Sequence, residues 1–519
     1  MIAIPQEILD LIVSEVDYKD RRNILSVSRD FQVATERLTW RDIYVNGDDI
    51  DSFVKLCTGH RAQVLRGVTF QVQFPNLRPT EEQKHVNCRP TPEEIRGDNE
   101  HFSKQIHGIF RALKTVEERV KASGEGLPRI SLNINTPGQY DVGLYCFHRK
   151  YRSWRLCLLH PRELPELSWV RKLSVGASGG CIYGGSDDGA YEFPLDLSML
   201  IDLSIKLPSI EELSCPYLAE RFPHSYDDAV IRHFTHPWEG PLRDSRHGLG
   251  TAIKEHLKTL PAGLKLLTMK FDEGVTGGCM DQSRALPDLV APGFYDPFSS
   301  GIRIISENMT DLDLQICADK TLFWPSPDEK GSGAPSWPHL KRLKVRFNII
   351  SPSGAWYFQG PRGEGREPSK FEVTQEHYPA LEENDTDRFW DDVWDDEGGR
   401  EENVNPDMFR VVPNDEVMEP FLEAFAKALG NMRAIEDAEL STTLVWYPSE
   451  ERQAGDYPDR PAEFLYQSTR WGLKYSRNKG HRSLEWQVGD WRPGTGLHRL
   501  FRASCGGGEC GGDLEERWI

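Results

Sequence analysis

The stretch from Leu340 to Ile350 reads LKRLKVRFNII, and it decides the fold that the sequence predicts. Apolar and polar side chains alternate within it, and an asparagine closes the alternation. The positions concerned are Leu340, Leu343, Val345, Asn348 and Ile350. Such alternation is typical of a strand with one buried face, and an Asn side chain can satisfy backbone groups where a chain turns. The stretch therefore predicts a strand that stacks its aliphatic side chains in a core and then turns.

The same apolar spacing recurs along the chain. Six further windows fit apolar-x-x-apolar-x-apolar: LRGVTF from Leu65, LPRISL from Leu127, VRKLSV from Val170, IEELSC from Ile210, LKLLTM from Leu264 and MTDLDL from Met309. Asn135 and Cys317 stand at the Asn/Cys position after two of them. The pattern is similar to the strand portion of a leucine-rich repeat, but the windows lie roughly thirty to sixty residues apart, wider than is usual. The resemblance implies an irregular α/β solenoid with long loop insertions.

Helical patterns lie between several strand windows. They cover Asp98–Ala122, Gly248–Leu260, Ser299–Asn308 and Glu416–Leu429. The last is the most regular, with Val417, Phe421 and Phe425 on one side and Gly430 as its expected C-terminal stop. Alternation of strands and helices predicts an α/β fold with a mainly parallel sheet. The alternative is an ordinary α/β protein in which such windows occur by chance.

The N-terminal stretch from Ile4 to Val45 carries more apolar side chains than one helix stripe requires. It reads IPQEILDLIVSEVDYKDRRNILSVSRDFQVATERLTWRDIYV. Between Gln6 and Val16 the apolar residues occupy two sides of a helix, whereas a helix that covers a single core shows one stripe. Pro5 fits the start of this helix. Part of this surface is therefore expected to contact a partner.

The same stretch resembles an F-box, the adaptor-binding module of SCF-type ubiquitin ligases. The motif is hydrophobic-Pro-x-Glu-Ile/Leu, then Asp, then Leu-x-x-Val-Ser/Cys-Arg-x-Phe/Trp, then Trp-Arg. The matching residues are Ile4, Pro5, Glu7, Ile8, Asp20, Ile24, Val27, Ser28, Arg29, Phe31, Trp40 and Arg41. Ile4 stands where Leu is commoner, and Arg21 and Arg22 follow the Asp where family members vary.

The resemblance implies three short helices that bind a Skp1-type adaptor, and through it a cullin and a RING subunit. Carried over by position, the adaptor face and its supporting core comprise Ile4, Pro5, Ile8, Leu9, Ile12, Leu25, Val27, Phe31 and Trp40. Sequence alone leaves open which of these face the adaptor. We expect Leu9→Asp to abolish adaptor binding. The alternative is an amphipathic helical hairpin that caps a larger domain.

The predicted organisation has three parts: an F-box over residues 1–47, an irregular solenoid over 48–447 and a C-terminal capping segment over 448–519. In the cap, strands are expected near Phe464–Tyr475 and Leu484–Val488, followed by a helix over Gly496–Ala503. Trp486 and Trp491 are expected to pack inward. The stretch WQVGDWRPGTGLHRLF is similar to the closing segment of fungal F-box-like proteins.

Composition narrows the function. The 519-residue chain has a formal net charge of −19 and no basic stripe, which disfavours nucleic acid as a ligand. No apolar run is long enough for a membrane span, the N-terminus does not look like a signal peptide, and ten cysteines without a CxxC pair suggest reduced thiols. These features predict a cytoplasmic or nuclear location.

Residues 381–403 contain eleven acids and two arginines, which predicts a solvated, self-repelling loop; the alternative is an acidic docking strip.

Catalytic and metal motifs are weak. Ser178 lies in a G-x-S-x-G stretch without the helix that a nucleophile elbow needs. His233 and His236 lie three residues apart, but Pro237 breaks the helix that a HExxH-type metal site would use. Cys505 and Cys510 lie close in sequence but lack further ligands for zinc. No cofactor, metal or active site is therefore expected.

The sequence predicts a non-enzymatic substrate receptor of a ubiquitin ligase that recruits an unknown protein; the alternative is a scaffold outside any ligase.

Overall fold

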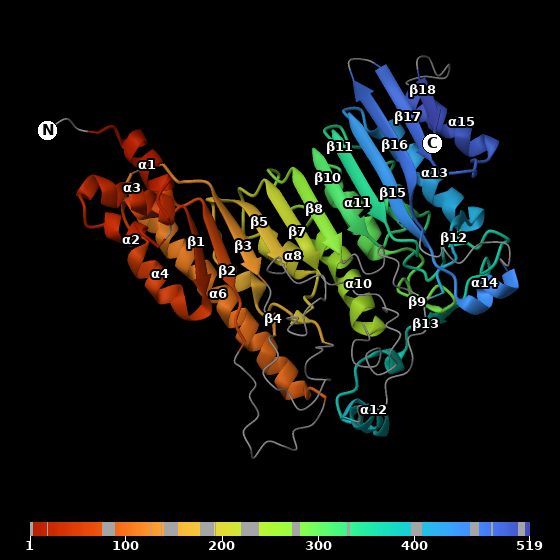
Figure 1. Cartoon of the computed structure of the whole chain (residues 1–519), viewed down its shortest axis with the longest axis horizontal. Coiled ribbons are helices and arrows are strands. Elements are labelled where there is room, and N and C mark those ends of the chain that lie inside the picture. The colour runs from red at the N-terminus through yellow and green to blue at the C-terminus, as the bar shows by residue number, and fades with distance from the viewer. Residues whose placement is uncertain are drawn as a thin grey trace.

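The protein is a mixed α/β molecule built around one large, mostly parallel sheet (Figure 1). The computed structural model describes residues 4–17, 19–74, 89–124, 126–135, 138–139, 154–176, 191–192, 194–218, 238–271, 281–329, 333–395, 407–456, 467–478, 481–506 and 514–519. The prediction of an α/β fold with a mainly parallel sheet is confirmed.

The strands of the large sheet follow one another in chain order, so each strand lies beside its predecessor. They are β1 (Asp42–Asn46), β2 (Gly67–Gln71), β3 (Ile130–Asn135), β5 (Val170–Gly176), β7 (Glu212–Leu218), β8 (Leu266–Phe271), β10 (Asp311–Ile316), β11 (Arg342–Phe347), β15 (Asp437–Trp446), β16 (Gln467–Asn478), β17 (His481–Gln487) and β18 (Leu514–Trp518). Pairing is parallel from β1 to β15, β16 is antiparallel to both of its neighbours, and β18 is parallel to β17. Parallel pairing needs a crossover of a dozen or more residues between successive strands. The wider spacing of the windows leaves room for longer crossovers, such as the one that contains the helix Pro92–Ala122 between β2 and β3.

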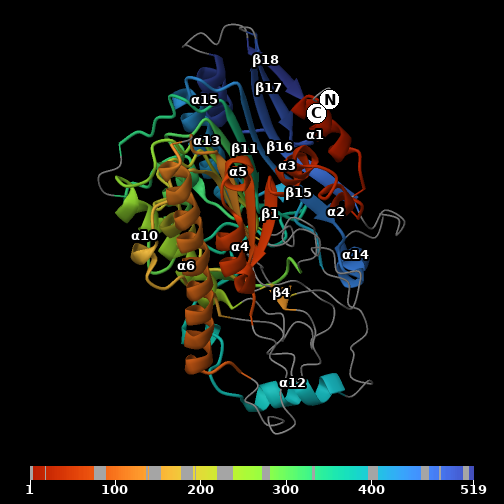
Figure 2. The same cartoon turned by 90° about the vertical axis from the view of Figure 1, so that its left-hand side faces the viewer.

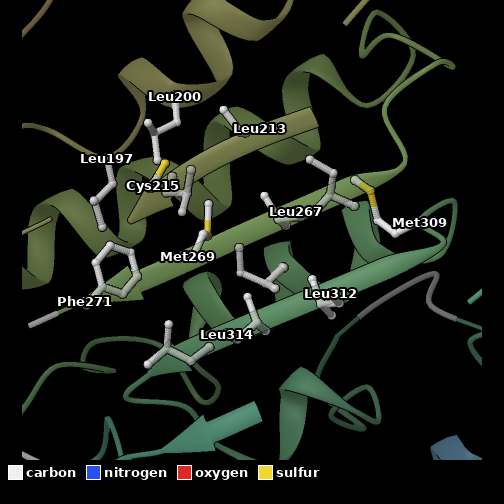
Figure 3. Close-up of a cluster of buried hydrophobic side chains, with 14 of the residues drawn as sticks. Leu197, Leu200, Leu213, Cys215, Leu267, Met269, Phe271, Met309, Leu312 and Leu314 are labelled. Atoms are coloured by element: carbon white, nitrogen blue, oxygen red, sulfur yellow. The ribbon is translucent and has the colours of Figure 1, made fainter. Parts of the chain in front are cut away.

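The seven windows coincide with seven neighbouring strands, and their apolar residues align across the sheet. One row runs through Val68, Leu132, Leu173, Leu213, Leu267, Leu312 and Leu343. All of these side chains are buried, and Figure 3 shows part of the resulting core between β7, β8 and β10. The expected register of β3 is wrong by two residues, because Leu132, not Ile130, occupies the row. Asn135 consequently pairs with Gly176 within the strands and does not mark the turn.

The Asn and Cys positions after β10 and β11 behave as their chemistry predicts. The buried Asn348 side chain accepts a hydrogen bond from the Ile350 backbone N–H (3.3 Å). The buried Cys317 thiol donates to the Ile350 carbonyl (3.4 Å). The two side chains thus satisfy both backbone groups of one residue at the turn.

Helices cover one face of the sheet, and Figure 2 shows α6, α10 and α15 on that side. The longer ones are α6 (Pro92–Ala122), α10 (Glu239–His256), α11 (Pro297–Ser306), α13 (Asp415–Asn431) and α15 (Thr495–Gly506). The shorter ones are α4 (Ile50–Leu56), α5 (His60–Val64), α8 (Met199–Ser204) and the 3-10 turns η1 (Gly47–Asp49), η3 (Pro161–Glu163), η5 (Lys320–Leu322) and η6 (Gln375–His377). The short helix α14 (Glu450–Asp456) follows β15 and lies away from that side in Figure 2. All four predicted helices are present. However, α13 passes through Gly430 and ends at Asn431, so Gly430 is not its stop.

Small elements lie beyond the carboxyl ends of the parallel strands (Figure 1). They are the paired strands β4 (Gly138–Gln139) with β6 (Tyr191–Glu192), β9 (Leu286–Asp288) with β13 (Lys370–Glu372), β12 (Phe358–Gln359) with β14 (Val412–Pro413), and the helix α12 (Asp385–Asp395). The predicted loop over 381–403 is therefore wrong for residues 385–395; residues 396–403 lie outside the described part of the chain. Asp387 is fully buried and paired with buried Arg89 (Nε to Oδ2, 3.0 Å), which neutralises one acid and anchors the helix.

The C-terminal strands and helix were largely expected. Both predicted strands appear as β16 and β17, and the predicted helix as α15. Trp486 is fully buried and stacks on Trp518 with ring centroids 4.9 Å apart. Trp491 is half-buried against the main core, and its Nε1–H donates to Asp415 (2.8 Å). These elements extend the same sheet.

Candidate functional site

Three short helices precede the sheet and form a small bundle, which we call the N-terminal bundle (residues 4–40). They are α1 (Gln6–Ser14), α2 (Arg21–Ile24) and α3 (Arg29–Thr39). Ser28 caps α3, because its side chain accepts a hydrogen bond from the Phe31 N–H (3.3 Å). Leu9 and Val13, one turn apart on α1, pack against Ala34 of α3 to form a core of their own. This core uses only one stripe of α1.

The remaining apolar side chains of the bundle are exposed. Ile4, Ile8, Leu11, Ile12, Leu25 and Val27 have exposed fractions between 39% and 64%. The first four lie at i, i+4, i+7 and i+8, which places them along one side of α1 and its approach. Leu25 and Val27 lie in the turn between α2 and α3. We call these six residues the exposed apolar group; solvent contact with so many aliphatic side chains is unfavourable.

The structure divides the predicted adaptor residues into two sets. Ile4, Pro5, Ile8, Ile12, Leu25 and Val27 are exposed. Leu9 is buried in the bundle core and Phe31 packs half-buried against it, whereas Trp40 packs half-buried against the main core of the sheet. Leu11, the second most exposed of the group, belongs to the surface although the motif did not include it. Its place one turn after Ile8 was the available signal.

A buried acid connects the N-terminal bundle to the rest of the molecule. Glu36 on α3 is almost inaccessible and accepts two hydrogen bonds from Arg61 of α5, at 3.1 Å and 2.7 Å. His60 and Gln32 also contact its carboxylate. The hydrogen bonds, of which that from Arg61 is the strongest, outweigh burial and lower the pKa of Glu36 to about 2. Arg61 also lies over the Trp40 ring, 5.1 Å from its centroid.

The chemistry available at the exposed apolar group is burial of aliphatic surface against another protein. The exposed acids Glu7 on α1 and Glu15 directly after α1 flank it. An apolar centre with a charged rim is the composition of a protein interface. Asp10 and Arg37 form an exposed ion pair (3.5 Å) between α1 and α3 that adds little to stability.

Of the catalytic and metal candidates from the sequence, the described part of the chain contains only Cys505. Ser178, His233, His236 and Cys510 lie outside the described residues. Cys505 is buried, and burial raises the pKa of its thiol to about 12. Within the described ranges, no three His, Cys, Asp or Glu side chains are placed to hold a metal ion. None of the described helices is long and apolar enough to cross a membrane.

No family model matches the chain, and no curated protein matches it. We therefore infer a function from the residues and their geometry.

Proposed function

We propose that the chain is a receptor subunit of an SCF-type ubiquitin ligase. In this proposal, α1 and the turn between α2 and α3 bind a Skp1-type adaptor, which links to a cullin and a RING subunit, while the sheet region recruits a protein substrate. The observation that supports it best is the exposed apolar group, left over after the bundle has formed its own core. The resemblance of the stretch from Ile4 to Arg41 to an F-box supports a Skp1-type adaptor as the partner.

The same proposal describes the sheet region as an irregular leucine-rich-repeat-like solenoid. Its support is the chain-order sequence of parallel strands and the alignment of the window residues across them. Long insertions between repeats would supply contacts for a partner. The chain itself would carry out no chemistry.

The energetics of adaptor binding are favourable on this surface. Full burial of one aliphatic side chain contributes roughly 1.5–3 kcal/mol. Ile8, Leu11 and Ile12 are each about half exposed, so burying the remainder of all three contributes on the order of 3 kcal/mol. Interfaces commonly depend on a few such side chains surrounded by contacts that exclude water.

The decisive experiment is co-purification of the tagged full-length protein with a Skp1-type adaptor and a cullin. The test variant is Ile8→Asp/Ile12→Asp, because both side chains are exposed and neither contributes to the bundle core. Thr39→Asp, on an exposed position of α3, is the control for an added surface charge on the same bundle. We expect wild type and Thr39→Asp to retain the adaptor and the double variant to lose it, with unchanged thermal unfolding in all three.

Leu9→Asp does not report on adaptor binding alone. Because Leu9 is buried, this variant places an unpaired charge in the bundle core and reports on folding as well as on binding. Adaptor recovery without the cullin would instead support a scaffold. Failure of the folded wild type to bind any adaptor would disprove the proposal.

A further inference from the structure

The face of the sheet opposite the helices is polar, and the sign of its charge alternates from strand to strand. From β5 to β17 the charged side chains on this open face are Lys172, Glu212, Lys270, Asp311 and Asp313, Arg342, Lys344 and Arg346, Asp437 and Glu439, Arg470 and Lys474, and Glu485. Each alternates along its strand with buried residues, such as Leu343 and Val345 of β11. The face is therefore a regular array of columns of opposite charge.

Most acids of this array are paired across strands. Lys172 contacts Glu212 (2.7 Å), and Lys270 contacts Asp313 (3.1 Å). Arg342 pairs with Asp311, and Arg470 pairs with Glu439. Cross-strand pairs of opposite charge favour the observed register.

Two cations of β11 are left out of this pairing. Lys344 has Asp313 and Glu439 as neighbours in register, but Lys270 and Arg470 engage those acids. The neighbours of Arg346 in register, Gln315 and Ser441, carry no charge.

Among the described residues, no acid lies within ion-pair distance of either Lys344 or Arg346. Arg346 is exposed, and its guanidinium donates only to the Gln315 side chain (3.4 Å). In a chain with a net charge of −19, two adjacent cations without an acidic partner form a local region of opposite sign.

We infer that Lys344 and Arg346 bind an acidic segment of a partner protein, through carboxylates two residues apart on an extended chain. Charge complementarity selects the sign of the partner, because Asp313 and Glu439, the acids in register with Lys344, are already neutralised. The strand geometry selects the spacing of the two acids. Residues i and i+2 of a strand lie about 6.6 Å apart, so Lys344 and Arg346 are separated by the same distance as the two acids of an extended acid-x-acid segment that runs along β11. The planar Arg346 guanidinium suits a carboxylate in two-point contact.

As a statement about the substrate of the proposed receptor, this inference rests on the proposed function. The binding of acidic segments by β11 does not require an adaptor, and the two are tested separately. Acidic peptides must also approach against the overall negative charge of the protein, so the binding is expected to be weak and to depend on salt.

The test uses the full-length protein and fluorescein-labelled peptides followed by fluorescence anisotropy at low salt. The probes are a Glu-Gly repeat, a Lys-Gly repeat and a phosphoserine-Gly repeat of equal length. The test variant is Lys344→Gln/Arg346→Gln. The matched control, Arg111→Gln/Lys258→Gln, removes the same charge at exposed positions on the helical side. Thermal unfolding verifies that both remain folded.

We expect the Glu-Gly peptide to bind wild type and the control alike, and the test variant about fivefold more weakly. Added salt should weaken the binding, and the Lys-Gly peptide should not show this dependence on Lys344 and Arg346. No binding of the Glu-Gly peptide up to about 1 mM, or an equal loss in both variants, would overturn the inference. So would binding of the phosphoserine peptide alone, which would make phosphate the ligand. Each of these outcomes leaves adaptor binding unaffected.

Discussion

Glu36 is a single side chain on which the attachment of the N-terminal bundle depends. Glu36→Gln removes the charge that holds Arg61, and we expect it to lower the free energy of unfolding by about 2–3 kcal/mol at pH 7. Because the pKa of Glu36 is lowered from 4.5 to about 2, its stabilising effect is complete above pH 4.5 and is lost as the pH falls toward 2. Urea unfolding at pH 7 and pH 3 measures both effects.

Asp10→Asn is the control for Glu36, since it breaks the exposed ion pair with Arg37. Its expected cost is below about 1 kcal/mol. Equal losses in the two variants would show that burial of Glu36 does not strengthen its pairing.

Asp319 should produce the opposite pH dependence. Burial, followed by the nearby Asp296 carboxylate, raises the pKa of Asp319 from 3.8 to about 6. A raised pKa gives stability that is complete below pH 3.8 and is lost as the pH rises through 6. We expect Asp319→Asn, which can still accept a hydrogen bond from the Thr321 N–H, to flatten the fall of the thermal midpoint between pH 4 and pH 7. An unchanged slope in the variant would contradict this assignment.

At the scale of single elements, α12 shows that acidic composition alone does not predict secondary structure. The eleven acids of residues 381–403 predicted a loop, and seven of them lie within residues 381–395. Residues 385–395 nevertheless form a helix. Its anchor is Arg89, 298 positions away in the sequence from Asp387. No local pattern could reveal that contact, because only the folded chain brings the two side chains together.

The anchor can be tested by hydrogen exchange. Arg89→Gln removes the cation of the buried Arg89–Asp387 pair, so we expect the amides of α12 to exchange about tenfold faster or more. Arg96→Gln removes only long, exposed contacts to Glu93 and Glu100 and should leave α12 unchanged. Equal exchange in Arg89→Gln and wild type would show that α12 is held by other contacts.

The strands were predictable because their apolar alternation is local, and the one error in register has a physical reason. In β3, Ile130, Leu132 and Ile134 alternate continuously, so the pattern fits two positions two residues apart. The neighbouring strands decide between them, because Leu132 pairs with Val68 of β2 and with Leu173 of β5. Similarly, the apolar excess of α1 was visible, but separating buried Leu9 from exposed Ile8 required the position of Ala34 on α3.

For the whole molecule, the boundary between the N-terminal bundle and the sheet can be located by truncation. β1 begins at Asp42 and pairs with β2 along its full length, so it belongs to the sheet although it falls within the predicted first domain. We expect a chain that begins at Arg41 to keep the sheet folded. A chain that begins at Asp48 loses β1 and should unfold at a lower temperature. Identical thermal midpoints would show that β1 contributes nothing to the sheet.

Because the strands of the large sheet lie in chain order, two strands that are further apart in the sequence also lie further apart in the sheet. Adjacent strands lie about 4.8 Å apart, and β11 is seven strand positions from β1 in the sheet. Measured along the sheet, Lys344 and Arg346 are therefore about 34 Å from the strand that follows the N-terminal bundle. Gain or loss of one strand-and-helix unit between them would change this separation by about 4.8 Å and leave both surfaces intact. The distance between the two proposed partners could then change in evolution without any change in the residues of either surface.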